Sequence, residues 1–133
     1  MGKADLHIHT TYSYDGSTSV RDTLKYASEA GLDVIAITDH DTVYGSFAGR
    51  ELASQYGLEV IPGLEVSTKE GHLLALYVEK NIPPKRPLIE TLQRIDDLGG
   101  IAIAPHPANR LPASLSLNAI MASLVNELIE TYC

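Results

Sequence analysis

Five histidines and several carboxylates are spaced along this sequence in a way that suits metal binding. The histidines are His7, His9, His40, His72 and His106, and nearby carboxylates include Asp39, Asp41 and Glu65. The only cysteine is the last residue, so a thiolate site is excluded and any metal must be held by nitrogen and oxygen. Imidazole and carboxylate ligands suit Zn, Mn or Fe, and the number of acids suits several ions better than one. We therefore predict a multinuclear site.

Four of these histidines end or follow an expected strand. Alternating or continuous apolar residues predict strands over 4–9, 32–38, 58–66, 72–78 and 101–104. His7, His9, His40 and His106 fall at or just past the carboxyl end of such a strand, which is where parallel sheets and barrels gather their active sites. His72 instead opens its strand, so either that boundary or the local geometry must differ.

Helices are expected between the strands. Ser19 and Asp22 resemble a capping box, and Gly31 stands where a C-terminal cap would be. Apolar spacing predicts further helices over 44–56, 88–98 and 117–129. The alternation indicates an α/β fold with a parallel sheet and helices outside it. Gly-rich phosphate-binding loops are missing, which favours a barrel-like sheet over an open one.

Length and charge narrow the class of protein further. The chain has 133 residues, in the range of a single domain over 1–133, and a formal net charge of −7. Such acidity is a poor match for long nucleic acid, whereas three divalent ions would reduce it to −1. No apolar stretch is long enough for a membrane span or a signal core, so a cytoplasmic protein is expected.

Each of these features also has an ordinary structural explanation. His7 and His9 point to the same face of a strand and could be a chance pair, and the aspartates flanking His40 could cap a helix. Glu65 could be a solvated charge, and the prolines around His106 could simply form a turn. Their joint occurrence at strand ends is what favours a metal site.

Five short motifs, in order, resemble those of the PHP (polymerase and histidinol phosphatase) family. They are Asp-Leu-His-Ile-His-Thr at 5–10, Thr-Asp-His-Asp at 38–41, Gly-Leu-Glu-Val-Ser at 63–67, Gly-His-Leu-Leu at 71–74 and Pro-His-Pro at 105–107. The resemblance covers the chain from residue 4 to about residue 110. It implies a distorted (β/α)7 barrel that holds up to three divalent metals and hydrolyses phosphoesters.

The resemblance also implies roles for individual residues. His7 and His9 would bind one ion, and Glu65 would bridge it to a second ion held by His72 and His106. Asp15 and His40 would bind a third ion, and Glu65, His40 and Asp15 would be central to catalysis by a hydroxide shared between metals. The aspartates at positions 5, 39 and 41 would orient imidazoles. Arg110 and Lys69 could reach a substrate phosphate.

The sequence departs from the family at its C-terminal end. The family carries a final Asp-x-His motif, but no histidine follows His106. We therefore expect a barrel truncated at its C-terminus, with an open edge through which a homodimer could form.

Three other functions remain open beside hydrolysis of a small phosphomonoester or nucleotide phosphate. The chain could be a catalytically incomplete metal-binding module. It could also be an exonuclease or accessory domain linked to a DNA polymerase, or a metal-dependent amide or lactone hydrolase.

Overall fold

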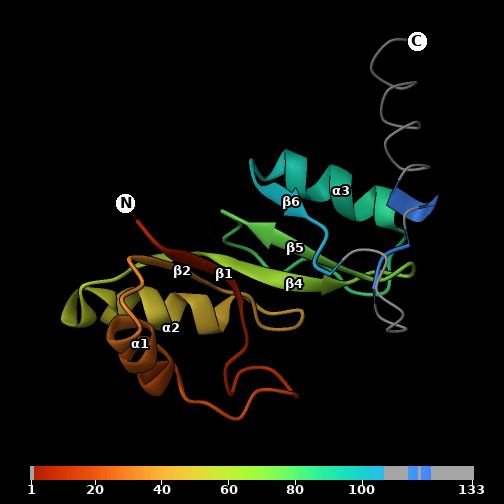
Figure 1. The fold of residues 1–133 in the computed structure, drawn as a ribbon. Helices are drawn as coiled ribbons and strands as arrows, with labels where there is room; N and C mark the ends of the chain where they lie inside the picture. Colours follow the sequence, from red (N-terminus) through yellow and green to blue (C-terminus); the bar gives the residue numbers. More distant parts are fainter. Residues whose placement is uncertain (1, 107–113, 117, 121–133) are drawn as a thin grey trace.

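The computed structural model describes residues 2–106, 114–116 and 118–120. Two three-stranded sheets form the centre, with α1 and α2 on one side and α3 on the other (Figure 1). The elements are, in order, β1 Ala4–Ile8, α1 Val20–Glu29, β2 Val34–Ile37, α2 Tyr44–Leu52, η1 Ala53–Tyr56, β3 Glu59–Ile61, β4 Gly63–Ser67, β5 His72–Leu76, α3 Leu88–Asp97 and β6 Ile101–Ile103. The predicted alternation of strands and helices, and with it the α/β class, is confirmed.

Local sequence signals set the helix ends. The Ser19 side chain accepts a hydrogen bond from the backbone N–H of Asp22 and so caps α1, as predicted. Gly31 and Gly57 follow α1 and η1 with φ angles of +78° and +67°, a conformation that glycine adopts at little cost. The last predicted helix, over 117–129, lies largely outside the described residues. In the described part of the chain, no helix combines the length and apolarity that a membrane crossing requires.

The first sheet is parallel, as predicted, with strand order β1-β2-β3. Its helix-covered face forms a core around Leu24, Ile35 and Ile37, all fully buried. This core fixes β1 and β2 side by side, so that their carboxyl ends lie at the same edge.

The second sheet, with order β4-β5-β6, corrects the prediction of an all-parallel sheet. Strand β5 pairs antiparallel with both β4 and β6. The reason is the connection, because only residues 68–71 separate β4 from β5. A parallel connection needs a dozen or more residues, whereas antiparallel neighbours need only a short turn.

A strand interrupted at Pro62 joins the two sheets. Ala36 pairs with Ile61 and His40 with Glu65, both in parallel and both at an offset of 25 residues. Strands β3 and β4 therefore keep one continuous register with β2 and the residues that follow it, with an interruption at Pro62. This register places Glu65 of β4 beside His40, which follows β2.

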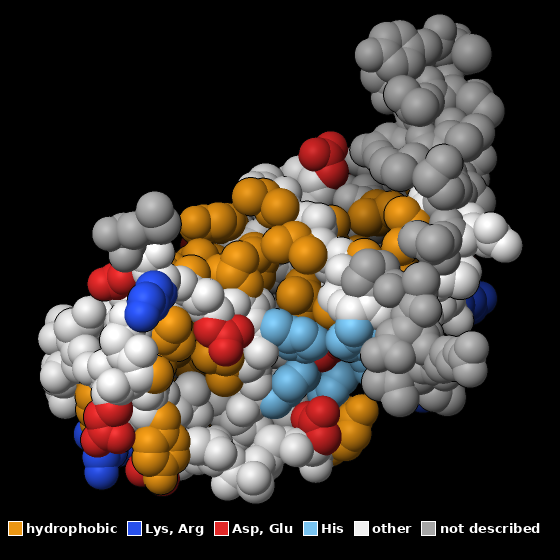
Figure 2. Space-filling model, in the orientation of Figure 1, with side chains coloured by type: hydrophobic (Ala, Val, Ile, Leu, Met, Phe, Trp, Pro, Cys, Tyr) orange, Lys and Arg blue, Asp and Glu red, His pale blue; other side chains and the backbone are white. Residues whose placement is uncertain are grey.

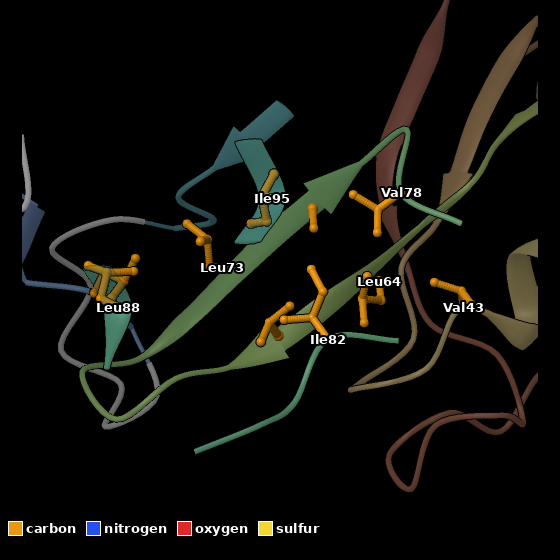
Figure 3. Packing of buried hydrophobic residues seen from close by; sticks show 10 residues of the cluster. Val43, Leu64, Leu73, Val78, Ile82, Leu88 and Ile95 are labelled. Atoms are coloured by element: carbon orange, nitrogen blue, oxygen red, sulfur yellow. The ribbon is translucent and has the colours of Figure 1, made fainter. Parts of the chain in front are cut away.

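A hydrophobic core holds β4 and β5 against α3. Leu64, Leu73 and Val78 belong to one buried cluster with Leu88 and Ile95 of that helix, and Figure 3 shows members of this cluster spread along β4 and β5. Because side chains alternate along a strand, the packing of Leu64 and Val66 into this core turns Glu65 to the opposite face. Core packing thus decides where the carboxylate points.

Apolar side chains are also exposed beside the histidines (Figure 2). Leu6 of β1 and Ile103 of β6 are partly buried against a small core, and Ile101 is 52% exposed. Among the described residues, β1 pairs only with β2, and β6 only with β5. Closure of a barrel and self-association through this edge stay predictions.

Replacing Gly45 by alanine tests how tightly α2 packs on the site. An added Cβ at this helix position would collide with the carboxylate of Asp39 and approach Thr10 Oγ1 to 3.1 Å. Alanine normally stabilises a helix by up to about 1 kcal/mol relative to glycine. We expect Gly45→Ala to lower the free energy of unfolding by about 2 kcal/mol instead, measured by urea denaturation. Gly2→Ala, whose Cβ would meet its nearest neighbour at 3.6 Å, should change it little; equal stability of the two variants would contradict this packing.

Candidate metal centre

All five histidines lie around one hollow on the protein surface. The hollow has a volume of about 200 Å³ and is lined by His7, His9, Tyr14, Asp15, His40, Glu65, His72 and His106. Figure 2 shows the histidine side chains as one group on this face. The structure therefore brings together all seven residues predicted as metal ligands, although they come from positions 7 to 106 of the chain.

The Glu65 carboxylate is at the centre of this group. Its Oε2 lies 3.1 Å from His7 Nε2 and 2.9 Å from His9 Nε2, and its Oε1 lies 3.2 Å from His72 Nδ1. His40 Nε2 is 3.7 Å from Oε2. One carboxylate thus faces imidazoles on both of its oxygens, which is the geometry that a bridging ligand requires.

Glu65 is only 1% exposed, so its charge depends on these neighbours. Burial by itself raises the pKa of Glu65, but the hydrogen bonds from His7 and His9 and the nearby imidazole charges lower it more. The net result is a pKa well below the ordinary range for a glutamate. The carboxylate is therefore ionised at neutral pH.

His7 and His9 are two residues apart at the end of β1, so their side chains share a face. Their Nε2 atoms are 3.2 Å apart. The hydrogen bond to Glu65 raises the pKa of His9, against the opposing effect of burial. This hydrogen bond places the His9 ring directly against the buried carboxylate.

The position of His72 follows from the reversed direction of β5. In the antiparallel pair, the first residue of β5, His72, lies opposite the last residue of β4, Ser67. A histidine that opens its strand therefore reaches the same edge as residues that close theirs, which resolves the exception noted in the sequence. Burial lowers the pKa of His72 more than Glu65 raises it, which favours the neutral ring that a metal ligand needs.

Asp15 and His40 form a second contact beside Glu65. His40 Nε2 lies 3.0 Å from Asp15 Oδ2, and His9 Nδ1 lies 3.8 Å from Asp15 Oδ1. Burial raises the pKa of Asp15, but the charges of His9 and His40 outweigh it and keep the pKa below its usual value. Asp15 thus offers an ionised carboxylate at the rim.

His106 completes the group from the far side of the hollow. Its ring stacks on that of His7 with centroids 5.9 Å apart, and its Nδ1 lies 2.7 Å from Ser114 Oγ. With Nδ1 engaged by Ser114, the Nε2 atom is left for a metal.

The three neighbouring aspartates have other roles than those predicted. Asp5 accepts the backbone N–H of His7, Asp39 accepts the backbone N–H and hydroxyl of Thr10, and Asp41 accepts the backbone N–H of Ser67. The described contacts of these carboxylates are therefore with backbone amides and a hydroxyl, not with imidazoles. They fix the strand ends that carry the candidate ligands.

Sequence reasoning missed two residues, Ser13 and Tyr14. Ser13 Oγ accepts the backbone N–H of His40 at 2.6 Å and lies 3.3 Å from His9 Nδ1, and Tyr14 stacks on His40. The available signal was their place in the loop between His9 and Asp15.

The two predicted substrate contacts are not tested by the structure. Lys69 is exposed in the β4–β5 turn and does not line the hollow, so its contact with substrate stays a prediction. Arg110 lies outside the described residues.

The donor atoms fit divalent metals. Among the residues that the structure describes, three groups have donor atoms within 4.8 Å of one another: His7, His9 and Glu65; His9, Asp15 and His40; His40, Glu65 and His72. Ligands held by one ion at about 2.0–2.2 Å are themselves about 3 Å apart, close to the separations of His7, His9 and Glu65. A ring that binds metal through Nε2 carries its proton on Nδ1, and for His9 Ser13 Oγ is placed to accept that proton.

Known proteins share this sequence pattern and fold. The family model described as PHP domain matches residues 5–108. An uncharacterized protein of Methanocaldococcus jannaschii, MJ1587, is 41% identical over 115 residues, which cover 79% of this chain and 67% of that protein. A phosphoribosyl 1,2-cyclic phosphate 1,2-diphosphodiesterase of Eggerthella lenta is 39% identical over 97 residues, covering 68% of this chain and 37% of the enzyme.

A crystal structure from Bacteroides vulgatus, of a two-domain protein containing a predicted PHP-like metal-dependent phosphoesterase, has the same fold. It superposes with a TM-score of 0.78 at 22% identity, over 94% of this chain and 41% of that one. The chain thus spans under half of two of these proteins and two thirds of the third.

Replacing Ser13 by alanine tests its support of the imidazoles. The change leaves the His40 backbone N–H without its acceptor and removes the neighbour of His9 Nδ1. We expect Ser13→Ala to weaken Mn²⁺ binding by about 10-fold in isothermal titration calorimetry. Ser17→Ala, at an exposed position of the same loop, is the matched control; similar affinities of both variants would rule out this role.

A second substitution tests the bridging position of Glu65. Glu65→Gln keeps the shape of the side chain but removes its charge, and we expect the affinity for Zn²⁺ and Mn²⁺ to fall by at least about 100-fold. Glu59→Gln, at an exposed position of β3, should bind as the wild type does. Metal content by mass spectrometry checks both, and an unchanged content of Glu65→Gln would refute the assignment.

Proposed function

Because this chain belongs to the PHP domain family, we propose that it is a metal-dependent phosphoesterase acting on small phosphomonoesters or nucleotide phosphates. The observation that carries the proposal is the buried Glu65 carboxylate, which presents Oε2 to His7 and His9 and Oε1 to His72. A carboxylate that faces imidazoles on both of its oxygens is well suited to bridge two adjacent cations. An ordinary ion pair would engage only one of the two oxygens.

The residues divide into three ligand sets for up to three divalent ions, Zn, Mn or Fe. His7 and His9 would share one ion with Glu65, and Glu65, His72 and His106 would hold a second. Asp15 and His40 would hold a third, with His9 close to both of them. When bound, divalent ions neutralise phosphate oxygens and lower the pKa of water so that it becomes a nucleophile.

The chain's own residues have two tasks in this proposal. The side chains of His40 and Glu65 are only 6% and 2% exposed. The backbone of Glu65 is paired with the residues on both sides of His40, since Asp41 N–H donates to the Glu65 carbonyl at 2.9 Å and Glu65 N–H to the Asp39 carbonyl at 3.0 Å. They would keep the ligand geometry constant as charge develops on phosphate. Asp15, at the rim with a side chain 41% exposed, would be closest to an arriving substrate.

The size and charge of the site favour a small substrate. The hollow of about 200 Å³ is open to solvent and is lined by ligand-type side chains, together with Tyr14. A net charge of −7 opposes binding of a long polyanion, whereas a single phosphate interacts mainly with the bound cations. Because the Eggerthella lenta relative is a cyclic phosphate diphosphodiesterase, cyclic or bridging phosphodiesters are worth including as substrates.

Phosphate release tests the proposal. We expect turnover of 4-nitrophenyl phosphate or of a member of a nucleoside monophosphate and bisphosphate panel in the presence of Mn²⁺, Zn²⁺ or Fe²⁺, and its loss after chelation. Glu65→Ala should reduce kcat/KM by at least about 100-fold, whereas Glu59→Ala should leave it within twofold. Tight metal binding without turnover of any phosphoester would contradict the proposal and identify the chain as a binding module.

A further inference from the structure

Three aromatic rings are stacked between the Glu65 carboxylate and the protein surface. The rings of His9 and His40 stack with centroids 4.6 Å apart at 21°, and the ring of Tyr14 stacks on His40 at 4.8 Å and 23°. His9 Nε2 is 2.9 Å from Glu65 Oε2, so the inner end of the stack touches the buried carboxylate. The outer end is Tyr14, which is 84% exposed. His40 stacks on the tyrosine ring, and most of the Tyr14 surface is exposed to solvent.

The loop that carries Tyr14 is held by hydrogen bonds on both sides of it. Ser13 N–H donates to the Thr10 carbonyl at 2.9 Å, Thr11 N–H to the Thr18 carbonyl at 3.0 Å, and Gly16 N–H to the Ser13 carbonyl at 3.2 Å. Ser13 is buried and its hydroxyl accepts the backbone N–H of His40. Tyr14 is therefore presented at the rim of the hollow by a fixed turn, next to Asp15.

An exposed aromatic ring on a fixed turn is a platform for another planar ring. Exposing a large aromatic face to water is unfavourable, and stacking of a nucleobase on such a face recovers that loss whatever the base, because every base has a π-face. The residues that line the hollow are imidazoles, carboxylates and this tyrosine; within the described part of the chain none is an amide of the kind that reads base edges. The site thus offers stacking without base readout.

We propose that Tyr14 determines the class of substrate by stacking on the base of a nucleotide whose phosphate occupies the hollow. This proposal rests on the function proposed above. The substrate is then a nucleotide rather than a sugar phosphate or an alkyl phosphate. It also implies weak discrimination among the four bases.

A matched pair of ligands isolates the base. AMP and ribose 5-phosphate share the ribosyl phosphate and differ in the adenine, so their KM values are compared for wild type, Tyr14→Ala and Tyr14→Phe in the presence of Mn²⁺. We expect Tyr14→Ala to raise the KM for AMP roughly tenfold, with ribose 5-phosphate unchanged within twofold, and Tyr14→Phe to behave as wild type. Tyr26→Ala, an exposed tyrosine of α1 outside the hollow, is the control.

Other patterns would overturn the inference. Equal losses for both substrates would mean that Tyr14 only positions His40, and a loss in Tyr14→Phe as large as in Tyr14→Ala would mean that the hydroxyl acts instead of the ring. Metal content is measured alongside and should be the same in all variants.

Calorimetric titration of the same two ligands separates this inference from the proposed function. Without turnover, tighter binding of AMP than of ribose 5-phosphate, lost in Tyr14→Ala, would support the stack while refuting hydrolysis. Equal affinity for the two ligands, or no binding of AMP by the wild type, overturns the inference whatever the turnover.

Discussion

The structure depends on the burial of one charged group, the Glu65 carboxylate. Removing an ion from water costs roughly several kcal/mol unless partners compensate for it, and Glu65 has imidazoles on both oxygens. Its backbone is paired at the same time with the end of β2, through the bridge between His40 and Glu65. The residue therefore joins the two sheets by its main chain and gathers the site by its side chain.

The rest of the fold can be understood as support for that position. The chain passes at Pro62 from one sheet into the other without loss of register, and the core of Leu64 and Val66 turns Glu65 away from α3. The short turn after β4 reverses β5 and delivers His72 to the same edge. Buried Asp39 ties the end of β2 to Thr10, just after the two histidines of β1.

Much of this was predictable from the sequence because the signals are local. Alternation in residues 4–9, the Ser19 cap and the Gly31 terminator predicted the first elements, and the strand-end histidines predicted most of the residues that line the hollow. The direction of β5 was wrongly predicted because periodicity gives no strand polarity, although the four-residue turn was a usable signal. Ser13 and Tyr14 were missed because their contacts with His40 arise only once β1 and β2 are adjacent, which is a tertiary property.

The most direct test of the account is a crystal structure of the metal-loaded protein with anomalous scattering measured at the absorption edge of the metal. The account predicts anomalous peaks on both sides of the Glu65 carboxylate, one bonded to the Nε2 atoms of His7 and His9 and another beside His72. A Glu65 carboxylate that keeps its hydrogen bonds to imidazoles, with metal bound elsewhere or not at all, would contradict it.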